Sequence, residues 1–566
     1  MLDNRLKAYL GPLQTDVTAA LDEMAAARVV SRLWARDHRL WKPDPTEITN
    51  RLGWLTVAEQ MRDHVGSLKA FARSVLEEGY THVVLLGMGG SSLGPEVLRC
   101  TFGSARGFPR LFVLDSTVPS VVSEVTKAIR PATTLFILAS KSGGTIEVMS
   151  LFAHFRALVE KARGNQGGKQ FIAITDPDTG LAALARERGF RTIFTNQPDI
   201  GGRYSVLSHF GLVPAALLGV DLDTLTARAV EMANTCGPDR PLQANPGAQL
   251  GAIMGMLGRS GRDKVTLIAS PKVKTFGLWA EQLLAESTGK EGKGLIPIAE
   301  EPLASPAAYG QDRLFVYLRL NGDANNGTDR HVKALERAGH PVVQLTLRDR
   351  YDLAGQFFLW EFATAVAGRL LGIHPFDQPN VQESKENTKR ILDEVRLTGR
   401  MPSVPMERTL ADLLKQAGPG NYLAILAYLR PTAQADAALK ALRRRLLLKY
   451  RLPTTSGYGP RYLHSTGQLH KGGPATGLFL ELVEDMTPKL DVPGAPYTFG
   501  VLAEAQSVGD LQSLQSHRRP VVRVRLGRNP LEKIKALART TSPAKTTRRR
   551  PSQTTKKAAA KRASKR

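Results

Sequence analysis

Short runs rich in Val, Ile, Leu and Phe alternate with helical patterns along most of this chain. Five such runs lie between residues 82 and 195, and three more lie between residues 264 and 347. Strands that are apolar along their whole length are typical of parallel sheets, because helices cover both faces of such sheets. The pattern therefore predicts an α/β fold with two doubly wound parallel-sheet domains.

The rest of the chain divides around these two sets of strands. A helical segment is predicted over residues 1–75, where LDEMAAARVVSRLWARDHRL places apolar residues three and four positions apart. We expect the first sheet domain at 76–225, the second at 226–400, a C-terminal accessory α/β unit at 405–527 and a basic, disordered tail at 528–566. A chain of 566 residues is too long for one core, which agrees with several domains.

Composition narrows the class of protein further. Only Cys100 and Cys236 are present, too few for a disulfide framework or a cysteine metal cluster, so a reduced, cytoplasmic location is expected. No apolar stretch reaches the roughly 20 residues that span a bilayer, and the N-terminal segment lacks a signal-peptide pattern. We therefore expect neither secretion nor membrane insertion.

The positive charge is concentrated at the C-terminal end of the sequence. The net charge is +25, and residues 541–566 contribute ten Lys or Arg and no acid. Such a tail either contacts nucleic acid or another anionic surface non-specifically, or is solvated without a specific role. No catalytic role is assigned to it.

Two turns rich in glycine and serine directly follow predicted strands of the first domain. Residues 87–94 follow the strand HVVLLG, and residues 140–145 follow the strand TLFILA. Ligands bind beyond the carboxyl ends of parallel strands, where helix N-termini offer free N–H groups to a phosphate. The glycine spacing does not match the dinucleotide motif, so no nicotinamide cofactor is predicted. Each turn alone is equally well explained as a capped strand-to-helix connection.

The first of these turns also matches a competing motif. Residues 90–94, GSSLG, fit G-x-S-x-G, the nucleophile elbow of α/β-hydrolases, in which Ser92 would be the nucleophile. The pattern is short, and the acid and histidine that a hydrolase also needs occur by chance in any long chain. A hydrolase therefore remains an alternative at this point.

Two further segments carry candidate catalytic groups. Arg203 follows Gly201 and Gly202, and its guanidinium can stabilise negative charge at a reacting centre. Glu286 lies between an apolar helix and a glycine-rich segment, a setting that can raise its pKa for proton abstraction. The alternatives are a surface ion pair for Arg203 and a solvated helix end for Glu286.

In this order, the segments resemble the glucose-6-phosphate isomerase family over residues 80–395. The resemblance implies two sugar-isomerase-type (SIS) domains and an enzyme of glycolysis and gluconeogenesis that interconverts glucose 6-phosphate and fructose 6-phosphate. It implies no metal, no cofactor and a homodimer. The segments GMGGS and SKSGGT correspond to the sugar-phosphate site of the family, and the residues implied for phosphate binding are Gly89, Gly90, Ser91, Ser140, Lys141, Ser142, Thr145 and Gln378.

The resemblance also implies the catalytic roles. GGRYS matches the arginine signature of the family, so Arg203 is expected to stabilise the enediolate intermediate. AESTGKEGKG is similar to the segment of its glutamate, so Glu286 is expected to move the proton between C1 and C2. Lys385 corresponds to a lysine that helps to open the sugar ring. Its signature is matched imperfectly, because Asn380 stands where the family has Gly and Gln382 where it has Glu.

A larger departure concerns the histidine that opens the sugar ring in bacterial members. The expected region, residues 302–315, contains none, but YLHSTGQ at residues 462–468 is similar to the missing motif and carries His464. We hypothesise that the C-terminal unit supplies His464 to the site, in cis or from another subunit. The alternative is that His464 merely lies in a glycine-rich loop. The unit also resembles the end of the isomerase half of fused transaldolase–isomerase proteins.

A second alternative function is a non-catalytic SIS-type sensor of sugar phosphates. Such a protein would keep the phosphate turns and use the basic tail for nucleic acid. It would be expected to lack Glu286, which this chain has. The sequence leaves open whether mannose 6-phosphate is also a substrate.

Overall fold

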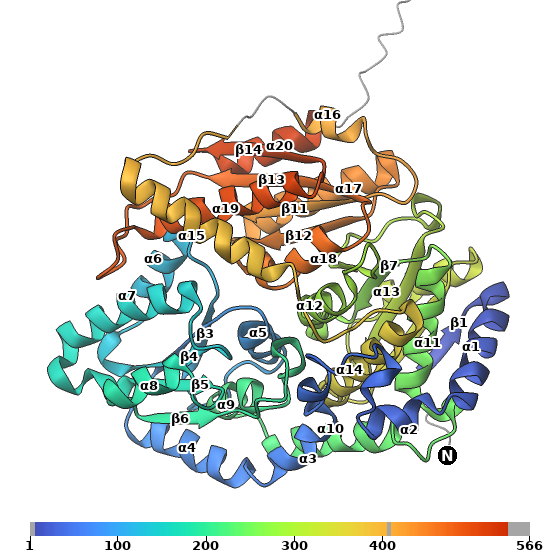
Figure 1. The fold of residues 1–566 in the computed structure, drawn as a ribbon, viewed down its shortest axis with the longest axis horizontal. Helices are drawn as coiled ribbons and strands as arrows, with labels where there is room; N and C mark the ends of the chain where they lie inside the picture. Colours follow the sequence, from blue (N-terminus) through green and yellow to red (C-terminus); the bar gives the residue numbers. More distant parts are fainter. Residues whose placement is uncertain (1–5, 405–408, 541–566) are drawn as a thin grey trace, which may run out of the picture.

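The computed structural model describes residues 6–404 and 409–540, which form three α/β lobes (Figure 1). The first lobe has a parallel sheet in the order β3-β2-β4-β5-β6. Its strands are β2 (His82–Gly87), β3 (Arg110–Leu114), β4 (Thr134–Ala139), β5 (Phe171–Thr175) and β6 (Thr192–Thr195). The connecting helices are α5 (Gly90–Phe102), α6 (Pro119–Ala128), α7 (Ile146–Arg163) and α8 (Gly180–Glu187).

Both faces of this sheet are buried, as the apolar runs predict. Along β2, Val83 and Leu85 belong to one hydrophobic core, whereas Val84 and Leu86 belong to another. Successive side chains of a strand point to opposite faces, so a strand between two cores must be apolar throughout. The doubly wound α/β class is therefore confirmed for this lobe.

The second lobe has a sheet in the order β1-β10-β9-β7-β8. Its parallel strands are β7 (Lys264–Ala269), β8 (Ile296–Ala299), β9 (Arg313–Leu320) and β10 (Val342–Leu347). Its helices include α10 (Leu222–Thr235), α11 (Pro246–Arg259), α12 (Phe276–Thr288), α13 (Asn326–Arg337) and α14 (Asp352–Leu371). The helix α14 is buried over almost its whole length, including the polar side chains of Asp352, Gln356 and Glu361.

The N-terminal segment is helical with one exception that the sequence did not predict. Its helices are α1 (Gln14–Ala26), α2 (Val29–Trp34), α3 (Trp54–Arg62) and α4 (Val65–Glu77); α3 packs on α10, and α4 packs on α9 (His209–Leu217). Before them, β1 (Leu6–Tyr9) pairs antiparallel with β10. The sequence of β1, LKAY, contains no β-branched residue, and its partner strand lies more than 300 positions along the chain.

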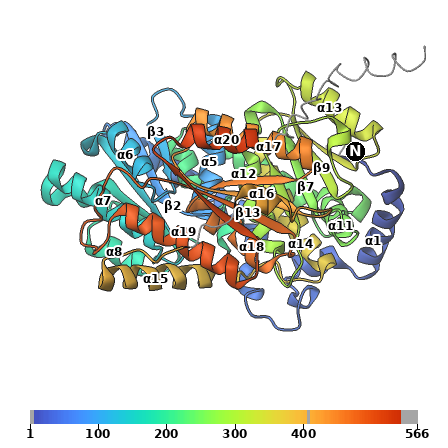
Figure 2. The same ribbon diagram turned by 90° about the horizontal axis from the view of Figure 1, so that it is seen from above.

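The third lobe is the C-terminal unit, which Figure 2 shows lying across the other two. Its parallel sheet has the order β12-β11-β13-β14, with β11 (Tyr422–Tyr428), β12 (Thr454–Tyr458), β13 (Gly477–Glu484) and β14 (Val521–Gly527). Its helices are α16 (Leu410–Leu414), α17 (Ala433–Tyr450), α18 (Gly467–Gly472), α19 (Phe499–Ser516) and α20 (Pro530–Thr540). Before the unit, α15 (Val381–Thr398) runs along α19.

The sequence prediction places the start of the disordered tail, at residue 528, too early. Residues 530–540 form α20, which packs on α17 and buries Ile534 completely, with Leu531 beside it. The sequence LEKIKAL places these apolar residues on one helical face, so the segment has something to bury. The ten basic residues of 541–566 lie outside the described residues. No helix in the described ranges is long and apolar enough to cross a membrane.

Candidate active site

A pocket of about 490 Å³ opens beyond the carboxyl ends of β2 and β4. The connection from β2 leads through α5 to β3, and that from β4 leads through α7 to β5, in opposite directions along the sheet. A crevice forms where strand order reverses in this way, and ligands of open α/β sheets bind there. All twelve residues that the sequence indicated for the site line this pocket: Gly89, Gly90, Ser91, Ser140, Lys141, Ser142, Thr145, Arg203, Glu286, Gln378, Lys385 and His464.

The turn after β2 needs glycine because other segments press against it. Gly89 has φ +54°, and a Cβ there would lie 2.5 Å from the backbone O of His464. A Cβ on Gly90 would lie 2.0 Å from the backbone O of Gly202, well inside contact distance. The glycines therefore allow the turn to meet both the arginine segment and the C-terminal unit.

The turn after β4 forms a cradle of hydroxyls in front of α7. The Ser140 and Thr145 hydroxyls are 3.0 Å apart, and the N–H of Gly143 donates to Ser140 Oγ at 3.1 Å. Thr145 is the N-cap of α7, but its side chain makes no capping hydrogen bond to the helix. Lys141 pairs with Asp176 at the pocket wall and donates to the O of Pro198 at 3.0 Å. Free helix N–H groups, hydroxyls and a lysine suit a phosphate monoester.

Arg203 is held rigidly at the base of the pocket. It is 2% exposed, so the alternative of a surface ion pair is wrong. Its guanidinium donates to Ser287 Oγ at 2.8 Å, to Gln378 Oε1 at 3.1 Å and to the backbone O of Pro375 and of Asp377 at 2.8 and 3.0 Å. A cation fixed by four acceptors can stabilise a developing anion without reorganising.

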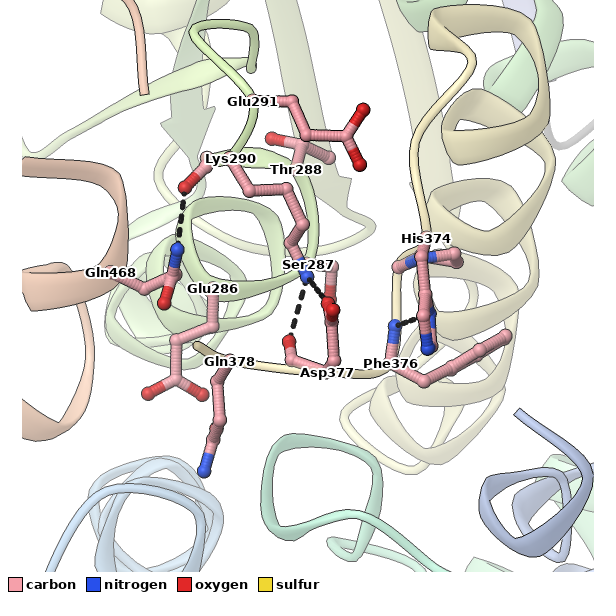
Figure 3. Close-up of polar contacts among 12 residues, drawn as sticks. Glu286, Ser287, Thr288, Lys290, Glu291, His374, Phe376, Asp377, Gln378 and Gln468 are labelled. Carbon is pink, nitrogen blue, oxygen red and sulfur yellow. Dashed lines mark hydrogen bonds and ion pairs between the residues drawn. The ribbon is translucent and has the colours of Figure 1, made fainter. Parts of the chain in front are cut away.

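Glu286 lies beside this cation, with its Oε2 3.6 Å from Arg203 Nη1. Its side chain is buried on α12, so it is not a solvated helix end. Burial raises the pKa of Glu286 to about 7, although Arg203, His464 and a hydrogen bond of 3.3 Å from Gln282 favour the ionised form. A carboxylate with a pKa near 7 is well matched to general base catalysis at neutral pH. Figure 3 shows Glu286 and Gln378 pointing the same way.

The loop that carries Gln378 is fixed by a buried lysine. Lys290 Nζ pairs with the Asp377 carboxylate and donates to the Asp377 backbone O at 2.7 Å (Figure 3). Burial lowers the pKa of Lys290 to about 8, with Arg203 adding to the effect and Asp377 opposing it. This pair orients the loop so that Gln378 and two backbone carbonyls meet Arg203.

Asn380, which departs from the family signature, contacts the C-terminal unit. Its N–H donates to Gln468 Oε1 at 2.8 Å, and Gln468 Nε2 donates to Asn380 Oδ1 at 2.8 Å and to the O of Gly289 at 3.0 Å. The side chain at position 380 therefore joins this loop to the motif that carries His464. The departure thus coincides with a docking contact of the extra unit.

The C-terminal unit of the same chain brings His464 into the pocket. His464 ends a short 3₁₀ helix (Arg461–His464), and its Nε2 lies 2.8 Å from Glu147 Oε1. Its backbone O accepts a hydrogen bond of 2.9 Å from Gln282. Burial tends to raise the pKa of Glu147, but the charge and hydrogen bond of His464 outweigh it and hold that pKa below its usual range. The carboxylate thus orients the imidazole toward the pocket.

Two residues of α19, one helical turn apart, hold Glu147 and the segment that carries His464. Gln506 Nε2 donates to Glu147 Oε1 at 2.7 Å, while Thr117 Oγ1 donates to Gln506 Oε1 at 2.7 Å. Asp510 accepts a hydrogen bond of 2.9 Å from the Tyr462 hydroxyl and pairs with Lys471 Nζ at 2.7 Å. These contacts fix both the partner of His464 and the segment that bears it.

Lys385 and Ser92 differ in their access to the pocket. Lys385 is exposed on α15 and lines the pocket from the side of the C-terminal unit. Ser92 is fully buried in α5, and the acceptors within reach of its hydroxyl are the O of Gly89 at 3.1 Å and Asp115 Oδ2 at 3.3 Å. A hydrolase nucleophile must be exposed at the turn and paired with a histidine, so this position argues against the hydrolase.

Several supporting residues were not predicted from the sequence. Gln282 precedes Glu286 by one helical turn, and Lys290 and Asp377 lie inside the matched segments, so helix spacing and the motifs themselves could have indicated them. Gln506 and Asp510 carry no local signal, because their partners are distant in the chain. Within the described ranges, no group of three or more His, Cys, Asp or Glu side chains is arranged to hold a metal ion.

The strand order and the pocket define a protein of the sugar-isomerase class with two SIS-type sheets. Among solved structures, a hypothetical protein of Thermus thermophilus matches with a TM-score of 0.59 at 23% identity, over 70% of this chain and all of that one. A glucose-6-phosphate isomerase of Chlamydia trachomatis matches with a TM-score of 0.57 at 18% identity, over 68% of this chain and 87% of that one. At these identities the likeness shows the fold alone.

Sequence comparison identifies the family. The family model of phosphoglucose isomerase matches residues 28–291. The glucose-6-phosphate isomerase of Rubrobacter xylanophilus is 30% identical over 377 residues, 58% of this chain and 86% of the relative. That of Symbiobacterium thermophilum is 30% identical over 401 residues, 62% of this chain and 89% of the relative. The chain belongs to the glucose-6-phosphate isomerase family.

Proposed function

We propose that this protein interconverts glucose 6-phosphate and fructose 6-phosphate by proton transfer between C1 and C2 through a cis-enediolate. The single observation that supports this best is the pair of Glu286 and Arg203. A carboxylate with a pKa near 7 lies 3.6 Å from a buried, rigidly held guanidinium, in the pocket that also contains the phosphate cradle. Proton transfer next to a carbonyl needs this combination of base and fixed cation.

The phosphate is bound at the turn after β4. The hydroxyls of Ser140, Ser142 and Thr145 line the pocket around the uncapped N-terminus of α7. Ser91, Gly89 and the adjacent N–H groups after β2 line the facing wall. Holding the phosphate at this end positions the open sugar chain along the pocket, so that binding energy contributes to orientation of C1 and C2.

Ring opening is assigned to Lys385 and His464. Both line the pocket, and His464 is oriented by Glu147 at 2.8 Å. An imidazole held in this way can exchange a proton with the ring oxygen or the anomeric hydroxyl of the sugar. Glu286 then carries the proton between C2 and C1, and Arg203 and Gln378 stabilise the enediolate oxygens.

The remaining expectations belong to the same proposal. The enzyme acts in glycolysis and gluconeogenesis, in the cytoplasm and as a homodimer, and it needs no metal or organic cofactor. The resemblance of the C-terminal unit to fused transaldolase–isomerase proteins stays a prediction, as does non-specific contact of residues 541–566 with anionic surfaces.

The test is isomerisation of fructose 6-phosphate by the purified protein without added metal, coupled to glucose-6-phosphate dehydrogenase. Wild type should be active and Glu286→Gln inactive, with Glu59→Gln on the exposed face of α3 as the matched control. A folded wild type that binds fructose 6-phosphate without converting it would contradict the proposal and favour the non-catalytic sensor. An active Glu286→Gln variant would show that another group is the base.

A further inference from the structure

The second sheet has a crevice that corresponds to the catalytic one in the first sheet. The connection from β7 leads through α12 to β8, and that from β9 leads through α13 to β10, so the strand order reverses between β7 and β9. Beyond the carboxyl ends of these two strands lies a cavity of about 420 Å³, nearly as large as the catalytic pocket. Ligands of open α/β sheets bind at such positions.

The floor and walls of this crevice are apolar. They are formed by side chains from β7, β9, α12 and the segment after β8: Leu267, Ile268, Ala269, Phe276, Leu303 and Leu318. A cavity of this size and lining suits an organic molecule with an apolar body.

The rim of the crevice is cationic. The charge of Lys440 is balanced by Glu300, with which it forms an ion pair at 3.1 Å. The other acidic residue that lines the crevice, Glu301, forms an ion pair with the buried Arg313 at 2.9 Å. Lys274 and Arg444 also line the crevice, and neither has an acidic side chain within ion-pair distance among the described residues. Two exposed positive charges are thus available to an anionic ligand.

The start of α12 adds to this positive potential. Phe276 and Gly277, its first two residues, line the crevice, and the N–H groups of Gly277 and Leu278 donate to the backbone O of Lys274 and of Thr275 at 3.4 and 3.0 Å. The aligned peptide dipoles of α12, whose positive end lies at the crevice, favour an anion there. The crevice therefore combines an apolar cavity, two cations without an acidic partner in the described part of the chain and the positive end of a helix.

We propose that this crevice binds a small organic anion with an apolar body, at a site separate from the catalytic pocket. The ligand is held between the second sheet and α17 of the C-terminal unit, because Ala441 and Arg444 of α17 form one wall. It also contacts the first turn of α12, the helix that carries Gln282 and Glu286 in the catalytic pocket. The proposal does not depend on the reaction that the protein catalyses.

The test is calorimetric titration of the full chain with anilinonaphthalene sulfonate, an aromatic anion, in the presence of saturating fructose 6-phosphate. We expect one site per chain and a higher thermal midpoint when the probe is bound. Ala441→Trp, which fills the exposed mouth of the cavity, should remove binding, whereas Ala437→Trp, exposed on the same helix outside the lining, should not. Replacing Lys274 and Arg444 by Gln should weaken binding at least about tenfold.

Three results would overturn the proposal. One is the absence of probe binding to wild type, and another is binding that Ala441→Trp and Lys274→Gln/Arg444→Gln leave unchanged. The third is displacement of the probe by fructose 6-phosphate, which would assign it to the catalytic pocket. Circular dichroism and isomerase activity of each variant check that the fold is intact, since none of these residues lines the catalytic pocket.

Discussion

Replacing Glu286 by Gln is expected to remove most of the catalytic activity and, at alkaline pH, to make the folded protein more stable. Glu286 is 4% exposed, and burial raises its pKa from 4.5 to about 7. Between these two values the folded protein keeps a proton that the unfolded chain has lost, so the free energy of unfolding falls as pH rises. At about 1.36 kcal/mol for each pKa unit, the loss reaches about 3 kcal/mol above pH 7.

The variant Glu286→Gln has no ionisable group at this position, so its free energy of unfolding should not show this decrease as pH rises. The two proteins should have similar thermal midpoints at about pH 5, and the variant should have the higher midpoint at about pH 8.5. In the wild type, kcat/KM should rise with pH up to about 7, because the base must be ionised. Above about pH 7, where the wild-type base is ionised, the variant should have a kcat about 10²-fold to 10⁴-fold lower than that of the wild type.

The assay is thermal unfolding of both proteins from about pH 5 to about pH 9 at one protein concentration, beside the coupled isomerase assay at the same pH values. Glu59→Gln, on the exposed surface of α3, is the matched control and should follow the wild type. A difference in midpoint that does not change with pH would refute the reasoning from burial. So would a wild-type activity that is already maximal at about pH 5, since the base would then have an ordinary pKa.

Three further predictions follow from the site. His464→Ala should lower kcat on fructose 6-phosphate by about 10²-fold, and full activity would contradict a role in ring opening. Asp510→Asn should lower the free energy of unfolding by about 3 kcal/mol, since it leaves the charge of Lys471 buried without its partner. The double variant Lys471→Met/Asp510→Asn should recover stability in urea unfolding. Equal stability of the single and the double variant would contradict this. Gly90→Ala should lower both activity and the thermal midpoint, because its Cβ would lie 2.0 Å from the backbone O of Gly202. Gly66→Ala, whose Cβ would meet no atom within 4 Å, should be neutral or stabilising. Equal effects of the two substitutions would contradict the importance of the contact at Gly90.

The sequence predicted the two SIS-type sheets well because strand signals are local. Eight predicted strands are present in the structure, and the helix after residue 145 begins at Ile146. Strands with weak signals were missed: β8 (IPIA) contains a proline, and β1 is recognisable only from its pairing with β10. The helix α20 was missed because the surrounding basic residues dominate the composition of that segment.

The residues of the site could be named from their motifs, but their properties could not. From the sequence, Arg203 and Glu286 could each have been exposed surface residues, but both are buried. Solvent exclusion depends on segments from all three lobes that close around the pocket, so the pKa of Glu286 is a property of packing. The same holds for Lys290, whose partner Asp377 is 87 positions away.

By itself, the sequence determined the local features of this protein: the apolar strands, the glycines that allow tight turns, and the residue types required for phosphate binding and proton transfer. These depend on interactions between near neighbours in the chain, which a short pattern records. Only the tertiary structure decided that His464 reaches the pocket of its own chain, that Glu147 and Gln506 orient it, and that a second crevice lies beyond β7 and β9. Those features depend on contacts between segments hundreds of residues apart and on the exclusion of water between them, neither of which has a local signature in the sequence.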